Sequence, residues 1–294
     1  MQNIPQPPPN NCEANQAYHY YASPDRRKTI LALGFKQKTL IAWQLTWAKL
    51  FPYLGIILLL TVVSACCSAI IATLCEINIA FSLLFIPLDI ATLLFSLGIL
   101  ASILHYLDGK ETRIRAQTLF EPFKRWISLL PIGAIYVCFC IPKNLHQLEV
   151  FESNIYYLIL FFITLSWFFL AYFYFFMADC QTATTKQIFV APFILLTRQP
   201  KIWLQAVLTY ILVYVALFLL VVLMFLAVSC VAPNMDLIAC YLYQDLSTVD
   251  LAGSLLVLFF LLILFILLLV SSIYTMFVFA IAYRQSIIAC GGYN

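Results

Sequence analysis

The stretch from Ile77 to Tyr106 constrains the fold of this chain more than any other feature. It is almost entirely apolar, and it is longer than the roughly 20 residues that a helix needs to cross the hydrocarbon core of a bilayer. Pro87 and Asp89 interrupt it near its middle. Because proline kinks or breaks the interior of a helix, the stretch predicts a transmembrane helix with length to spare for tilt or for a kink at Pro87, with Asp89 close to the bilayer midplane.

The composition indicates the same class of protein. Hydrophobic residues make up 64% of the 294 residues and charged residues only 10%, whereas soluble domains carry about 25% charged residues. The formal net charge of +3 is too small to indicate a nucleic-acid partner. Since apolar stretches fill most of the chain, we expect no separate soluble domain.

Six stretches are long and apolar enough to cross a membrane. We therefore expect an all-α fold, a polytopic membrane helix bundle of six transmembrane helices in three hairpins. Residues 1–37 are polar and proline-rich at their start, which predicts a disordered cytoplasmic tail, and residues 38–294 form the six-span membrane domain. The predicted spans cover residues 51–74, 77–106, 126–148, 155–177, 203–231 and 251–283.

The distribution of charge orients these spans. Membrane proteins retain Lys and Arg in their cytoplasmic segments. Of the 16 Lys and Arg residues, only Lys143 falls on the side opposite the N-terminus when the six spans are counted. Acidic residues gather on that opposite side, at Glu76, Glu149, Glu152, Asp236, Asp245 and Asp250. Both termini are therefore predicted to lie in the cytoplasm.

Residues 38–50 precede the first predicted span. Apolar residues recur three or four positions apart in this segment, at Leu40, Trp43, Trp47 and Leu50. Polar residues lie between them, so the periodicity predicts a short amphipathic helix in the headgroup region. This is one of the interfacial amphipathic segments expected in the fold.

Each predicted pair of spans follows a segment that contains tryptophan and basic residues. We call these the approach segments; they are Ala42–Gly55, Phe120–Gly133 and Phe193–Leu208. They are either remnants of a duplicated hairpin or the ordinary gathering of Trp and Lys at a membrane interface. The sequence leaves both interpretations open.

This plan resembles a known family. The six spans, the three approach segments, the Ala191 and Pro192 pair in the loop 186–203, and the end of the chain from Tyr283 to Gly292 are similar to a bacterial family of six-helix inner-membrane proteins. That family is related to the membrane domain of glycerophosphodiester phosphodiesterases. The resemblance implies a multi-pass protein of the bacterial cytoplasmic (inner) membrane, with a role in envelope maintenance or transport. It carries no catalytic residue to this chain.

Asp89 is the residue that the sequence singles out for function, together with Pro87. A charge at the bilayer midplane costs about 2.5–3.5 kcal/mol on insertion scales, and no Lys or Arg lies in the core of a predicted span to pair with it. Asp89 is therefore either an intramembrane coupling site for a proton or cation, or a neutral acid in interhelical hydrogen bonds. Its expected partners in the second case are hydroxyls such as those of Ser82, Ser166 and Tyr172.

The 10 cysteines do not follow a metal-binding pattern. Those within or beside spans, such as Cys66 and Cys67, lack the paired Cys-x-x-Cys spacing of zinc sites. Cys230 and Cys240 flank the last outer loop, where they either form a disulfide or remain free thiols.

His105, Asp108 and Glu111 lie three residues apart at the inner end of the second span, as either a solvated helix end or a cation site. No motif of a hydrolase, a metalloprotease or a phosphate-binding loop occurs in the chain. We therefore expect no enzyme activity, no catalytic residue, no metal site and no cofactor.

Two functions of different kinds fit these features. The first is a structural or accessory role in the membrane or envelope, exerted through helix packing and contact with membrane lipids, other membrane proteins or a second copy of the chain. The alternative is a small transporter or permease whose pathway passes a proton- or cation-coupling site at Asp89. The apolar spans favour the first function.

The six-span topology predicts which loops face outward. In a variant without native cysteines, single cysteines at Asn154 and Thr248 should react with a membrane-impermeant thiol reagent added outside intact cells. Both positions lie in loops that the charge distribution places outside. If neither position reacts, the six-span topology is wrong.

Overall fold

The computed structural model describes residues 33–108, 114–147, 170–180, 183, 185–231 and 251–290. This part of the chain is helical and contains no strand, which confirms the all-α fold class. The helices are α3 (Phe35–Ile77), the 3₁₀ helix η1 (Ile79–Leu84), α4 (Phe85–Leu107), α5 (Ala116–Lys124), α6 (Trp126–Gln147), α8 (Thr185–Arg198), α9 (Pro200–Val231) and α11 (Leu251–Ala289). Residues 170–179 form a further helical segment.

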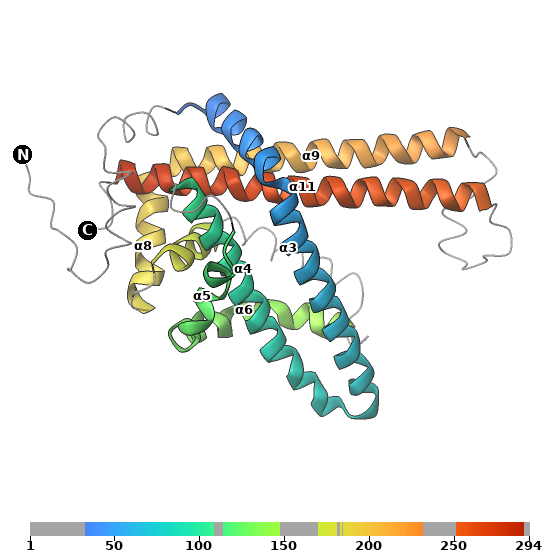
Figure 1. Ribbon diagram of the computed structural model, residues 1–294, viewed down its shortest axis with the longest axis horizontal. Coiled ribbons are helices and arrows are strands. Elements are labelled where there is room, and N and C mark those ends of the chain that lie inside the picture. The colour runs from blue at the N-terminus through green and yellow to red at the C-terminus, as the bar shows by residue number, and fades with distance from the viewer. Residues whose placement is uncertain are drawn as a thin grey trace, which may run out of the picture.

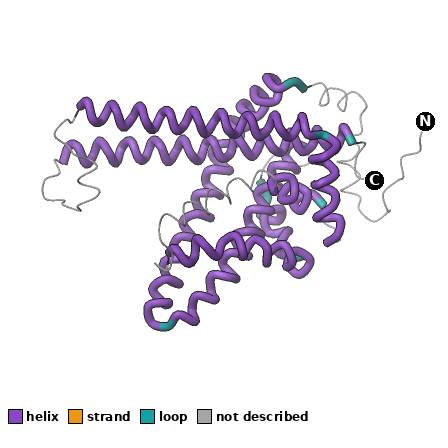
Figure 2. Tube along the Cα trace, turned by 180° about the vertical axis from the view of Figure 1, so that it is seen from behind, coloured by secondary structure: helices purple, strands orange, loops and turns teal. Residues whose placement is uncertain are grey.

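Two hairpins make up most of the bundle. The long helices α9 and α11 lie side by side along their length, and α3 crosses α11 before it pairs with α4 (Figure 1). Figure 2 shows the same arrangement from behind, with the α3 and α4 hairpin extending away from the α9 and α11 pair. The starts of α3 and α9 meet the ends of α4 and α11 at one end of the bundle, which we call the packed end.

Four helical stretches among the described residues are long and apolar enough to cross a membrane: Phe35–Ile77, Ile79–Leu107, Pro200–Met224 and Leu258–Ala289. They contain or largely overlap the first, second, fifth and sixth predicted spans, and they fit a multi-pass membrane protein. Helix α6 covers the third predicted span. The fourth is described only from residue 170 onward, so six spans with both termini inside stay a prediction.

Burial is concentrated at the packed end. Ile273, Phe277 and Tyr283 in the second half of α11 are completely or almost completely buried. In contrast, Leu258 in the same helix and Phe218 in α9 leave 63% and 66% of their surface exposed. Exposed apolar surface of this extent suits contact with lipid chains rather than water. The bundle is therefore closely packed at one end and presents apolar helix surfaces toward the other.

The predicted headgroup helix 38–50 is not a separate helix. It forms the first part of α3, which continues through Pro52 to Ile77. Ala42, Thr46 and Leu50 are buried along one side of this part. Tertiary packing therefore holds the segment in line with the span, although a proline inside a helix removes one backbone hydrogen bond.

Pro87 lies near the start of a helix and not in the interior of one. The chain turns at Asn78, whose side chain accepts a hydrogen bond from the Ala80 N–H at 2.9 Å, and then passes through η1. Helix α4 begins at Phe85, so Pro87 occupies its first turn. A proline is tolerated there because the first amides of a helix have no partner within the helix. Of the two alternatives, tilt or a kink, the kink at Pro87 in the interior of a long helix does not occur, because Pro87 lies in the first turn of α4.

The three approach segments differ in local structure. The second contains a break at Arg125 between α5 and α6, and the third contains a break at Gln199 between α8 and α9. The first lies entirely within α3. The second and third segments therefore share a short helix that leads into a longer one, whereas the first does not.

Helix α5 lies directly on α4 at Gly98. A Cβ atom added to Gly98 would lie 2.2 Å from the carbonyl oxygen of Leu119 and 2.9 Å from its Cα atom. The ring of Phe95 packs edge-on against Phe120 and Phe123, with centroid distances of 5.2 and 4.8 Å. Only glycine permits this approach of the two backbones.

This close contact predicts a large effect of a single methyl group. Gly98→Ala should lower the free energy of unfolding by about 1–3 kcal/mol, because the backbone of Leu119 must move away. Unfolding in mixed micelles with increasing sodium dodecyl sulfate, followed by circular dichroism, measures the change. The control is Gly55→Ala in α3, where no atom lies within 4 Å of the added Cβ; it should be neutral or stabilising. Equal stability of the two variants would contradict the contact.

Candidate functional site: a buried polar cluster at the packed end

Arg284 of α11 binds two carboxylates that come from different parts of the chain. Its Nε donates to Asp108 Oδ1 at 2.9 Å, and its Nη2 donates to Asp108 Oδ2 at 2.7 Å. Its Nη1 and Nη2 donate to the two oxygens of Asp179 at 2.5 and 2.8 Å. Bidentate pairs of this kind are among the strongest hydrogen bonds in proteins. One guanidinium therefore joins α11, the end of α4 and the segment 170–179.

This ion-pair cluster lies inside the protein. Only 11% of the Arg284 side chain and 6% of the Asp108 side chain are exposed, and Asp179 is exposed to 11%. Tyr283 adds a hydrogen bond from its hydroxyl to Asp179 at 3.4 Å. Because buried charges lose their hydration, each must be compensated by a partner within the protein.

Arg125 adds a second cation beside Asp179. It lies at the junction of α5 and α6 and donates from Nη1 to the Cys180 carbonyl at 2.7 Å and from Nη2 to the Met177 carbonyl. Burial lowers the pKa of its guanidinium, and the nearby Glu121, Cys180 and Asp179 oppose this shift. An arginine stays charged at physiological pH. It therefore stabilises the carboxyl end of segment 170–179, where helix carbonyls are unsatisfied.

Lys38 forms a second polar group at the packed end. Its Nζ donates to the side-chain oxygen of Gln205 in α9 at 2.5 Å and to that of Gln285 in α11 at 2.9 Å. Lys38 is only 4% exposed. The ammonium thus links the first turns of α3 to two other helices.

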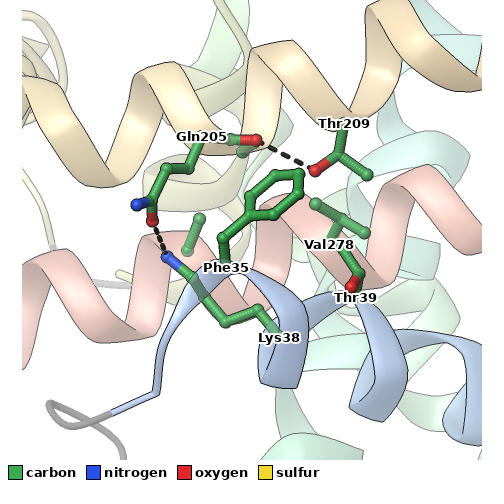
Figure 3. Close-up of a pocket in the computed structure, with 8 residues that line it drawn as sticks. Phe35, Lys38, Thr39, Gln205, Thr209 and Val278 are labelled. Carbon is green, nitrogen blue, oxygen red and sulfur yellow. Dashed lines mark hydrogen bonds between the residues drawn. The ribbon is translucent and has the colours of Figure 1, made fainter.

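A shallow pocket adjoins Lys38, with a cavity volume of about 10 Å³, which is room for about one water molecule. Figure 3 shows Lys38, Gln205 and Thr209 on its wall, with the hydrogen bonds from Lys38 to Gln205 and from the Thr209 hydroxyl to the Gln205 carbonyl. Ligand pockets usually enclose about 300–1,000 Å³. The pocket is smaller than a typical ligand site.

Asp89 is buried in α4, with 7% of its surface exposed. Helix α6 approaches α4 beside it: a Cβ on Gly133 would lie 3.8 Å from the side chain of Ile90, and Tyr136 lies within electrostatic reach of Asp89. Of the predicted hydroxyl partners, Tyr172 forms a hydrogen bond with Ser286 at 3.0 Å, and a hydroxyl partner for Asp89 stays a prediction. Ser166 lies outside the described residues.

The sequence did not identify the ion-pair cluster. His105, Asp108 and Glu111 were expected to form a solvated helix end or a cation site, but Asp108 is buried against Arg284, and Glu111 lies outside the described residues. Arg284 and Lys38 were assigned to membrane topology alone. Arg284 and Asp108 were both predicted to lie at the same membrane face, and this shared location was the only signal in the sequence for their contact.

Within the described residues, no group of three His, Cys, Asp or Glu side chains has the arrangement of a metal site. Cys66, Cys67, Cys138 and Cys140 are not joined in disulfides. Cys240 lies outside the described residues, so the alternatives for Cys230 and Cys240 stay open.

Comparisons with protein-family models, with curated proteins and with solved structures found no match to this chain. The described residues define the class by fold and site: an all-α bundle with four helical stretches long and apolar enough to cross a membrane, and a buried ion-pair cluster at one end.

Loss of the shared cation should destabilise the fold strongly. Arg284→Gln leaves two buried carboxylates without their guanidinium, so we expect the free energy of unfolding to fall by about 3–5 kcal/mol. The same titration with sodium dodecyl sulfate measures it. Arg115→Gln, at an exposed arginine, is the control and should change stability by less than about 0.5 kcal/mol.

A variant without charges separates electrostatics from packing. Combining Arg284→Gln with Asp108→Asn and Asp179→Asn should recover at least half of the lost stability, because all three charges of the Arg284 cluster are removed together and Glu121 remains near Arg125. Wild-type stability of Arg284→Gln alone would show that the cluster does not hold the helices together.

Proposed function

We propose that this protein is a structural or accessory component of the bacterial inner membrane, acting in maintenance of the membrane or envelope. The observation that supports this most is that the buried charged side chains form hydrogen bonds between helices. Arg284 and Lys38 connect helices to one another through short hydrogen bonds. Side chains engaged in this way brace a bundle and are poorly suited to line a route for a solute.

The apolar surface supports the same function. The halves of α9 and α11 away from the packed end expose large hydrophobic side chains such as Phe218 and Leu258. Such surfaces suit contact with lipid chains, with other membrane proteins or with a second copy of this chain. A closely packed end combined with long helices that expose apolar side chains fits a protein that acts through contact with lipids or with other membrane proteins.

Transport is the second candidate, and Asp89 favours it. An acid that is 7% exposed within an apolar helix is an unusual feature, and such residues often mark ion pathways. In this function Asp89 binds a proton or cation, and the start of α4 at Phe85 lies about one turn from it. Replacing the carboxyl by an amide would then abolish coupling.

The two functions are distinguished by deleting the gene and testing which variants of the protein restore the membrane barrier. We expect the deletion strain to admit a membrane-impermeant dye, and we expect wild type and Asp89→Asn to restore the barrier equally at equal protein levels. The structural role also predicts that Arg284→Gln restores it poorly, because the packed end is weakened.

Two results would contradict the structural role. The first is a deletion strain with an intact barrier under osmotic stress and detergent. The second is failure of Asp89→Asn to complement although the variant is present and folded, which would establish the coupling function instead.

A further inference from the structure

Helix α8 has two apolar sides, of which one is buried and the other is exposed except for an edge contact of Phe189 with Phe173. Ile188, Pro192 and Leu195 face the interior of the bundle and are buried. The opposite side carries four hydrophobic residues at helical spacing, with exposed fractions between 38% and 62%: Phe189, Val190, Phe193 and Ile194. In water this side would be an exposed apolar patch, which soluble proteins avoid.

Basic residues flank this exposed apolar side. Lys186 precedes it, and Arg198 and Lys201 follow it, and all three are exposed. Neither α8 nor α9 contains an Asp or Glu. Among the described residues, the carboxylates Asp108 and Asp179 at the packed end are buried and bound to Arg284. Glu121 of α5 is half-buried and lies near Arg125. The charged side chains of α8 and of the start of α9 are therefore all basic, which favours the binding of an anion.

The direction of α8 fits a membrane surface. It runs crosswise to α9 and α11 at the packed end, whereas those two helices lie along each other (Figures 1 and 2). If α9 and α11 cross the bilayer, a crosswise helix at their end lies along its surface. A helix with an apolar side and basic residues in this position is typical of binding to anionic lipids.

We propose that α8 binds the phosphate headgroups of anionic phospholipids, with Phe189, Val190, Phe193 and Ile194 inserted at the boundary of the acyl chains. Lys186 contacts headgroups at one end of the helix, and Arg198 and Lys201 contact them at the other. The helix of 14 residues is about 21 Å long, so the two ends reach different lipids. With the predicted topology, these lipids belong to the cytoplasmic leaflet.

This inference rests on the membrane placement of the proposed function, but not on a role in the envelope. Each basic residue near an anionic bilayer surface contributes about 1 kcal/mol, or about fivefold in affinity. Lipid selectivity is therefore expected to depend on charge at three positions and to fall at high salt.

The test uses the purified full-length protein in nanodiscs that contain spin-labelled phosphatidylglycerol or spin-labelled phosphatidylcholine with the same acyl chains. Electron paramagnetic resonance reports the immobilised fraction of each lipid. We expect wild type to prefer phosphatidylglycerol, and we expect the triple variant Lys186→Gln, Arg198→Gln and Lys201→Gln to lose at least about fivefold of this preference.

A charge-preserving variant is the matched control. Lys186→Arg with Arg198→Lys and Lys201→Arg keeps all three charges and should retain the preference. Because these side chains are exposed, both variants should fold, which circular dichroism and size-exclusion chromatography verify. These readouts are independent of complementation, so a failure here leaves the structural role standing, and an intact barrier in the deletion strain leaves this inference standing.

Three results would overturn the inference. The triple variant could keep the full preference for phosphatidylglycerol. Free glycerol phosphate could displace the spin-labelled lipid as effectively as phosphatidylglycerol, which would indicate a site for soluble phosphate. The triple variant could also change only the oligomeric state of the protein, which would assign the surface to a protein contact.

Discussion

The ion pairs of Arg284 are the interaction on which the packed end depends. A guanidinium inside a helix bundle is unfavourable unless carboxylates compensate it, and Asp108 and Asp179 do so with four hydrogen bonds of 2.5 to 2.9 Å. These acids belong to segments far apart in the chain. The pairing therefore fixes where α4 ends and where segment 170–179 lies against α11, and Arg125 then anchors the junction of α5 and α6 to the same place.

The remainder of the bundle follows from this fixed end. Lys38 attaches the beginning of α3 to α9 and α11, and Gly98 admits α5 onto α4. Away from these contacts, the described surfaces of the long helices carry exposed apolar side chains such as Phe218 and Leu258. In a bilayer such surfaces need no further protein partner, because lipid chains solvate them. The result is a closely packed end, from which α8 runs crosswise to α9 and α11.

Local rules predicted the elements of this fold well and their breaks poorly. The apolar stretches gave the all-α class and agree with four spanning helices, since a helix satisfies its own backbone in lipid. The structural effect of Pro87 could not be predicted from the sequence, because it depends on the position of the proline in the helix. In the first turn of α4 a proline is tolerated, whereas in a helix interior it causes a bend. Residues 38–50 were predicted to form a separate headgroup helix, but they continue into the span because Ala42 and Thr46 are buried against the bundle.

The sequence by itself determined the class of the protein, since length and hydrophobicity of a segment are sufficient to decide whether it can cross a bilayer. It also singled out Asp89, because an acid in an apolar helix is conspicuous without any knowledge of its neighbours. The site at the packed end was decided only by tertiary structure. Arg284 and Asp108 are separated by 176 positions, and charged residues at helix ends look alike in a sequence whether water or another helix receives them. Only the packing of α4 against α11 turns them into a buried pair.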